Sequence, residues 1–180
     1  RAAGRPVIGI DLKILDDDGN EVPTGEAGEV CVRGPNVTLG YLNRPEENEK
    51  AFKNGWFHTG DVGRVDENGV MFLMDRKKDM IISGGENIYT SEVEAALYKH
   101  PDVFECAVIG IPDDKYGEAL FAVIVTVPGE TLTEDIIIEH CRELIAGYKV
   151  PRQMDFVEEL PKSAMSKILK NELRDIYGNK

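Results

Sequence analysis

The sequence predicts an α+β fold, with a small β-rich subdomain over residues 1–76 and a compact α+β domain over residues 77–180. Two observations predict this fold class and this division of the chain. The first 75 or so residues alternate apolar and polar side chains in short stretches separated by turn residues. Later residues combine apolar runs typical of buried strands with an amphipathic stretch at 133–147, a mixture typical of a sheet covered by helices.

Short strands and tight turns dominate the first part. Residues 7–15 read as a strand that ends at an Asp-rich turn containing Gly19, and residues 28–34 as a second strand between glycines. A short helix is expected at 46–52. A hairpin follows over residues 63–74, because Asn-Gly is a strong turn signal between apolar runs.

Five consecutive charged residues at 75–79 interrupt the pattern, either as an exposed turn or as a linker. A short strand at 80–82 and a flexible loop at 83–87 follow. Ser91 with Glu94 has the spacing of a capping box and predicts a helix to about Lys99. The remaining expected elements are strands at 106–111, 119–127 and 154–157 and helices at 133–147 and 167–177.

Composition excludes several classes of function. The chain has 180 residues, 42% hydrophobic and 30% charged, with a formal net charge of −12. That charge argues against a nucleic-acid partner, and the longest apolar run, about 119–127, is too short for a transmembrane segment. Residues 142–180 hold eight Lys and Arg against six Asp and Glu, either an ordinary tail or a region kept positive to meet phosphate.

Cysteines and histidines give no sign of a disulfide or a metal site. Three widely spaced cysteines fit reduced thiols in a cytoplasmic protein. The three histidines share no metal-ligand spacing, so no metal site is expected. Gly-x-Ser-x-Gly, Walker and dinucleotide motifs are all missing from the sequence, which leaves covalent hydrolase and P-loop chemistry without support.

Asp61, Arg76 and Lys167 are the residues whose chemistry fits a nucleotide. Gly60 allows a sharp turn that presents the Asp61 carboxylate, a two-oxygen acceptor suited to adjacent hydroxyls, and Trp56 and Phe57 are expected to anchor that turn. Arg76 is a bidentate donor and Lys167 a point charge suited to phosphate. A surface turn, a linker charge and a surface lysine are the alternatives.

Several ordered segments resemble the AMP-forming acyl-CoA synthetases of the adenylate-forming enzyme superfamily. They are residues 28–42, 55–61, 75–87 and 161–167, and the resemblance covers essentially the whole chain. In that family a large amino-terminal domain binds ATP and a carboxylic acid, and a smaller carboxy-terminal lid moves over it. The resemblance implies that residues 1–76 end the former domain and residues 77–180 form the lid.

The resemblance also implies roles for particular residues on the nucleotide side. Asp61 would hold the two ribose hydroxyls of ATP or AMP, with Arg76 assisting. Lys167 would be the catalytic lysine, contacting the α-phosphate and the acyl carboxylate as pyrophosphate leaves.

Further roles concern the lid movement and coenzyme A. Lys78 falls at the hinge, where backbone rotation swings the lid between two reaction poses. Gly84 and Gly85 would approach the thiol channel, and Tyr116 would stack near the coenzyme A adenine. The implied substrates and cofactors are a small-molecule carboxylic acid, ATP, coenzyme A and Mg²⁺ on the phosphates. A fatty acid is the favoured substrate, and aryl and dicarboxylic acids stay open because the acyl pocket lies outside this chain.

Two departures from the family pattern limit these implications. The family has glycine before the catalytic lysine, whereas this chain has Ser166, which would strain the loop if the position needs a positive φ. The phosphate loop, the adenine segment, the acyl pocket and the Mg²⁺ ligands belong upstream of Arg1. The chain is therefore expected to be a piece of a longer protein, inactive without its amino-terminal domain.

Other functions stay open at this point. A peptide-synthetase adenylation unit uses the same chemistry, and a luciferase-like oxidase is conceivable. From a different class, a non-catalytic lid-like module would bind coenzyme A or a partner without turnover.

Overall fold

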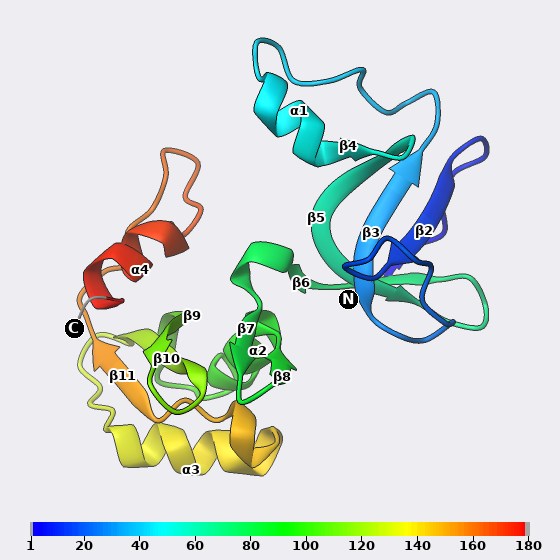
Figure 1. The fold of residues 1–180 in the computed structure, drawn as a ribbon. Coiled ribbons are helices and arrows are strands. Elements are labelled where there is room, and N and C mark those ends of the chain that lie inside the picture. The colour runs from blue at the N-terminus through cyan, green and yellow to red at the C-terminus, as the bar shows by residue number, and fades with distance from the viewer. Residues whose placement is uncertain (1, 179–180) are drawn as a thin grey trace. The chain divides into compact units, whose positions relative to one another are not determined.

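The computed structural model describes residues 2–178 and divides the chain into two compact units (Figure 1). The first ends at Lys78 and the second begins at Asp79, two residues beyond the predicted boundary. Sheets and helices occur in the predicted mixture, so the α+β fold class is confirmed. Among the described residues, no helix combines the length and the apolar composition that crossing a bilayer requires.

The first unit is an antiparallel sheet in the order β1-β6-β5-β3-β2, with β4 also paired to β5 and one short helix beside it. Its predicted hairpin forms because the Asp66 carboxylate accepts hydrogen bonds from the backbone N–H groups of Asn68 and Val70. The elements are β1 (Ala2–Gly4), β2 (Asp11–Leu15), β3 (Gly28–Arg33), α1 (Pro45–Ala51), β4 (Phe52–Lys53), β5 (Trp56–Val65) and β6 (Met71–Arg76).

The second unit is a mixed sheet in which β10 pairs antiparallel with β9 and β7 and parallel with β11. A 3₁₀ turn, η1 (Lys77–Asp79), joins the two units. The elements are β7 (Ile81–Ser83), β8 (Glu86–Ile88), α2 (Thr90–Leu97), β9 (Val103–Asp113), β10 (Gly117–Thr126), α3 (Glu134–Leu144), η2 (Gly147–Lys149), β11 (Gln153–Phe156) and α4 (Lys170–Tyr177).

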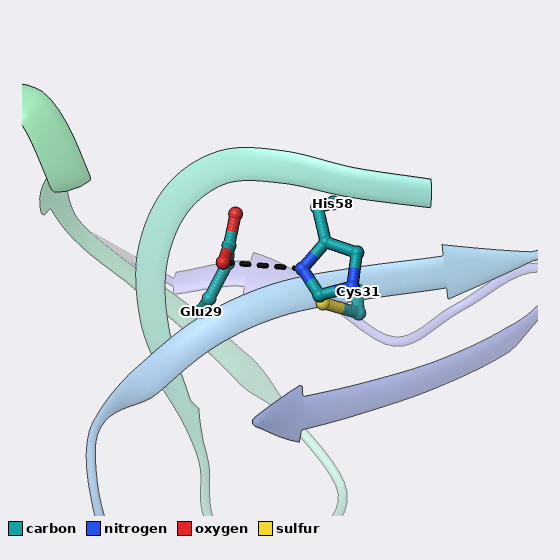
Figure 2. Close-up of side chains that lie close together, drawn as sticks. All are labelled: Glu29, Cys31 and His58. Carbon is teal, nitrogen blue, oxygen red and sulfur yellow. Dashed lines mark hydrogen bonds and ion pairs between the residues drawn. The ribbon is translucent and has the colours of Figure 1, made fainter. Parts of the chain in front are cut away.

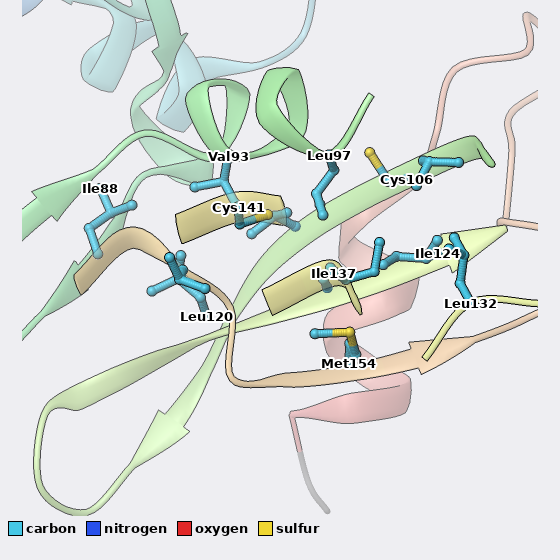
Figure 3. Close-up of a cluster of buried hydrophobic side chains, with 14 of the residues drawn as sticks. Ile88, Val93, Leu97, Cys106, Leu120, Ile124, Leu132, Ile137, Cys141 and Met154 are labelled. Atoms are coloured by element: carbon cyan, nitrogen blue, oxygen red, sulfur yellow. The ribbon is translucent and has the colours of Figure 1, made fainter. Parts of the chain in front are cut away.

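Both faces of the β9–β10 pair are buried, which explains why these strands read as continuous apolar runs. Along β9, Cys106 and Val108 enter one cluster, whereas Ala107 and Ile109 enter another. The first cluster packs α2 and α3 against the sheet (Figure 3). The second contains Leu173 and Tyr177 of α4. The second unit therefore has helices on both sides of its sheet.

Two expected helix starts are wrong. Helix α2 begins at Thr90 with Tyr89 as its N-cap, and no side chain caps it. The Glu94 carboxylate accepts from the Val108 backbone and pairs with Lys170, so the residue predicted to close the capping box also joins α2 to β9 and α4. The last helix begins at Lys170 rather than residue 167, because the chain there is still in a tight turn.

Neighbouring isoleucines on α3 provide a matched test of this packing. Ile137 is fully buried, whereas Ile136 is 42% exposed on the same turn. Ile137→Ala should lower the free energy of unfolding by about 3 kcal/mol because it leaves a cavity, and Ile136→Ala by roughly 1 kcal/mol or less. Urea unfolding of both variants measures the difference. Equal losses would contradict the assignment of the core face.

Candidate functional site

Asp61 lies on an irregular stretch of β5. Glu29 of β3 pairs with Val62, and Cys31 pairs with His58, so residues 59–61 face Val30 alone. Extra residues on one strand bend it and re-aim the side chains there. Gly60 has a φ of 71°, which a glycine adopts without strain. The predicted sharp turn before Asp61 is therefore a bulge within a strand.

Arg76 lies directly opposite Asp61 on the neighbouring strand β6. Its Nη1 donates to Asp61 Oδ1 at 2.6 Å and to the carbonyl oxygen of Thr59 at 3.3 Å. The Asp61 backbone N–H is held by Thr59 Oγ1, which in turn donates to the Val30 carbonyl. Both predicted ribose residues thus meet in one place, although they are fifteen residues apart.

The aromatic residues before the bulge are fixed as expected, by contacts that alternate across the strand. The Arg33 guanidinium lies over Trp56, with Cζ of Arg33 4.6 Å from the centroid of the Trp56 ring. Phe57 packs against Phe52 of β4, with ring centroids 5.0 Å apart. A hollow of about 730 Å³ opens beside this strand, with Thr59 and Gly60 in its wall.

Glu29 is a mostly buried acid that sequence reasoning left without a role. Its carboxylate faces His58 Nδ1 at 3.2 Å (Figure 2). It also accepts from the Gly60 backbone N–H at 3.2 Å and from Lys77 Nζ at 3.1 Å. Burial by itself would raise the pKa of Glu29, but hydrogen bonds from His58 and Lys77 outweigh it and lower that pKa. An isolated acid inside an apolar strand was the sequence signal for this role.

Glu29, Cys31 and His58 also form a cluster of three potential metal ligands. Lys77 pairs with Glu29 Oε2, the same oxygen that His58 faces. The lysine ammonium therefore already has the position next to this oxygen that a metal ion would need. Burial and the Glu29 charge raise the pKa of the Cys31 thiol to about 11, which opposes formation of a thiolate ligand. The ion pairs explain the cluster without a metal.

Lys167 lies in a tight turn between two short antiparallel segments. Lys162 and Ile168 form an isolated bridge, and the Ser163 N–H donates to the Lys167 carbonyl at 2.8 Å. Ser163 Oγ accepts from the backbone N–H groups of Met165 and Lys167, both at 3.3 Å. The turn orders the backbone and leaves the Lys167 side chain exposed.

Ion pairs fix the chain on both sides of this turn. Lys162 pairs with Glu105 of β9 at 2.7 Å. Lys170 donates to Thr90 Oγ1 and pairs with Glu94, each at 2.7 Å. The catalytic candidate therefore lies on a loop whose two ends are tied to the sheet and to α2.

Ser166 adopts the left-handed conformation, with a φ of 59°. The condition under which a serine strains this loop is therefore met in the structure, because the position has a positive φ. Its backbone N–H donates to the Ser163 carbonyl at 2.9 Å, which closes the turn before Lys167. The strain is thus localised next to Lys167.

Gly84 and Gly85 form the two-residue turn between β7 and β8, and both have positive φ. The predicted flexible loop is therefore a tight hairpin in which Ser83 pairs with Glu86. The Gly84 N–H donates to the Tyr116 carbonyl, and a Cβ at Gly84 would lie 3.3 Å from the Tyr116 ring. A side chain at this position would crowd the Tyr116 ring and strain a backbone with positive φ, so glycine suits this close approach.

Tyr116 lies in the turn between β9 and β10, where Asp113 Oδ1 accepts its backbone N–H at 2.8 Å. Its ring is 43% exposed and lines a pocket of about 350 Å³ that also includes Tyr148 and Arg152. Gly84 lies in the wall of the same pocket. Two aromatic rings and a guanidinium are a chemically apt surface for a nucleotide base and a phosphate.

The predicted site residues thus occupy four places within the two units. Asp61 and Arg76 meet in the first unit, and Lys78 is its last residue, within the turn η1. In the second unit, Gly84 lies against Tyr116 with Gly85 beside it, and Lys167 occupies its own turn.

Family models match both units. The model of the AMP-binding enzyme C-terminal domain matches residues 92–167, and that of the AMP-binding enzyme matches residues 1–42. A long-chain-fatty-acid–CoA ligase of Escherichia coli O6:H1 is 47% identical over 172 residues, which is 96% of this chain and 30% of the relative. The chain belongs to the AMP-binding, adenylate-forming enzyme family.

Other members of the family act on different acids. A feruloyl-CoA synthase of an Amycolatopsis species is 47% identical over 98% of this chain and 36% of its own length. The solved o-succinylbenzoate CoA synthetase of Bacillus subtilis, in complex with its acyl-adenylate, is 41% identical with a TM-score of 0.90. That match covers 97% of this chain and 35% of the solved chain. This chain thus spans about a third of the length of these family members.

The left-handed conformation of Ser166 leads to a prediction about the stability of the turn before Lys167. Ser166→Gly should raise the free energy of unfolding by about 0.5–1 kcal/mol, since glycine adopts the left-handed conformation without strain. Thermal or urea unfolding measures the change. Ser163→Gly is the matched control, and it should lower stability because Ser163 Oγ accepts two backbone hydrogen bonds in the same turn. A loss of stability in the Ser166 variant would contradict the strain.

Proposed function

We propose that this chain is the carboxy-terminal part of an ATP-dependent carboxylic acid–CoA ligase. The observation that supports this most directly is the similarity of nearly the whole chain to acid–CoA ligases, with the chemically suitable residues Asp61, Arg76 and Lys167 in ordered positions. The parent enzyme first forms an acyl-adenylate and then an acyl-CoA thioester, releasing pyrophosphate and AMP.

In the first step, a carboxylate oxygen of the acid attacks the α-phosphorus of ATP, and the bond to the bridging oxygen of pyrophosphate breaks. Asp61 binds the ribose hydroxyls as a two-oxygen acceptor, and Arg76 orients that carboxylate through its hydrogen bond to Oδ1. The Lys167 ammonium stabilises the negative charge that builds on the phosphate oxygens. Mg²⁺, held by residues of the amino-terminal domain, would lower the repulsion between the phosphates and the attacking carboxylate when bound.

In the second step, the coenzyme A thiol attacks the acyl carbonyl carbon, and the bond to the AMP oxygen breaks. The pocket between Tyr116 and Tyr148 accepts the adenine of coenzyme A, and Arg152 in its wall binds a phosphate. The Gly84-Gly85 hairpin lines the path of the pantetheine arm, because its missing side chains allow a close approach. Backbone rotation at Lys78 brings the lid from the first pose to the second.

Within this class we propose a fatty acid as the substrate and the cytoplasm as the location. The long-chain-fatty-acid–CoA ligase similarity supports the former, although the feruloyl-CoA synthase is equally identical. Three buried free cysteines support a reducing compartment. A peptide-synthetase adenylation unit and a non-catalytic lid-like module are the alternatives, and the following experiment separates them.

Lys167→Ala in the full-length parent protein tests the proposal. Acid-dependent exchange of pyrophosphate into ATP should fall about 10²–10³-fold, because a charge aimed at the transition state is lost. Thioester formation from added acyl-adenylate should change much less. Assays with a long-chain fatty acid and with ferulate identify the acid, and an amino acid as the better substrate would favour the peptide-synthetase alternative.

Lys99→Ala is the control, because Lys99 is an exposed lysine in the turn that follows α2. It should leave both half-reactions unchanged. The 180-residue chain alone should show no exchange. Unchanged pyrophosphate exchange in the Lys167 variant would refute the role of this lysine. A wild-type parent protein that binds coenzyme A but shows no turnover would favour the non-catalytic module.

Tyr116→Ala in the same protein tests the coenzyme A pocket. Loss of one stacking ring should raise the KM for coenzyme A roughly tenfold and leave pyrophosphate exchange unchanged. Phe104→Ala is the matched control, because Phe104 is a 60% exposed aromatic residue on β9 outside this pocket. An unchanged KM for coenzyme A would show that Tyr116 does not contribute to binding coenzyme A.

A further inference from the structure

The residue before Lys78 is held to the first unit by a bridged ion pair. Lys77 Nζ lies 3.1 Å from Glu29 Oε2 and 2.8 Å from Asp17 Oδ1. Glu29 is only 11% exposed and is itself held by His58 and the Gly60 backbone N–H. Moving Lys77 would leave a mostly buried carboxylate without its nearest cation, which is costly.

The residue after Lys78 is held to the second unit in the same way. Arg174 Nη2 donates to Asp79 Oδ1 at 2.7 Å, and the Asp79 side chain is 12% exposed. Arg174 belongs to α4, whose Leu173 and Tyr177 are buried against the sheet. Asp79 is therefore tied to a helix that packs on the core of its own unit.

We propose that these two ion pairs, Lys77 with Glu29 and Asp17, and Asp79 with Arg174, are clamps that confine the lid rotation to Lys78. Each clamp joins a neighbour of Lys78 to the unit on its own side, so neither has to break when the units turn against each other. The inference rests on the proposed function, in which the lid adopts two poses. It assigns Lys77 and Arg174 as positioning residues.

Confinement has a physical advantage for a two-pose enzyme. A linker with several rotatable residues reaches many orientations, and each productive pose is then a smaller fraction of the ensemble. Rotation at a single residue leaves two backbone angles to set. The Arg174 clamp also links the hinge to α4, the helix that directly follows the Lys167 turn.

Lys78→Pro in the full-length enzyme provides the test, because proline fixes φ and restricts the preceding residue. With both clamps intact, locking Lys78 should lower one of the two half-reactions by about 100-fold or more and largely spare the other. Adding Lys77→Met and Arg174→Met releases both ion pairs, and Asp79, which the proline does not restrict, can then rotate in place of residue 78. The lost half-reaction should recover by roughly tenfold, about the value of one partly buried ion pair.

Recovery of activity distinguishes a hinge role from a structural one, because damage to the fold would not restore a half-reaction. Two matched controls on the Lys78→Pro background should restore nothing. The charge-conserving pair Lys77→Arg and Arg174→Lys keeps both clamps. The pair Asp11→Asn and Glu92→Gln removes one ion pair from each unit at other places, those with Arg33 and Lys149.

Three results would overturn the inference. They are full activity of Lys78→Pro in both half-reactions, no recovery after the clamps are released, and equal recovery in the control variants. Loss of both half-reactions in the Lys77→Met, Arg174→Met double variant without the proline would also contradict it. A wild-type parent that makes no acyl-CoA would instead refute the proposed function, so the two failures are distinguishable.

Discussion

The pairing of β9 with β10 is the constraint on which the second unit depends. Because both faces of this pair are buried, alternate residues hold α2 and α3 on one side and α4 on the other. The turn that joins the two strands carries Tyr116, and the start of β10 at Gly117 pairs with Ser83 beside the Gly84 hairpin. The packing that stabilises this unit therefore also places its candidate coenzyme A pocket.

In the first unit, the interaction on which the candidate site depends is the one made by the Glu29 carboxylate. One carboxylate, ionised because two donors outweigh its burial, holds the bulge before Asp61 and the lysine beside the proposed hinge. The nucleotide residues and the chain leaving the unit thus share one support. A buried acid with three partners is more costly to remove than any exposed pair in the same sheet.

Much of the fold was predictable because its signals are local. Apolar runs marked β9 and β10, and the Asp66–Gly69 turn marked the β5–β6 hairpin. Helix starts were less predictable. The capping-box spacing placed the start of α2 at Ser91, whereas the helix begins at Thr90, and Glu94 also bonds to the distant residues Val108 and Lys170.

The candidate site divides in the same way. Residue identity and order alone indicated Asp61, Arg76 and Lys167, because a ribose needs an acceptor pair and a phosphate needs a cation. The contact of Asp61 with Arg76 required a strand register, and the network around Glu29 required three segments that lie far apart in the chain.

Taken by itself, the sequence determined the α+β class, the candidate nucleotide residues and the resemblance to a family, because these depend on composition, periodicity and motif order. Only the tertiary structure decided that Ser166 is left-handed, that Gly84 touches Tyr116, and that Lys77 and Asp79 are paired to opposite units. Those facts depend on which atoms meet across long separations in the chain, and short-range patterns do not encode such meetings.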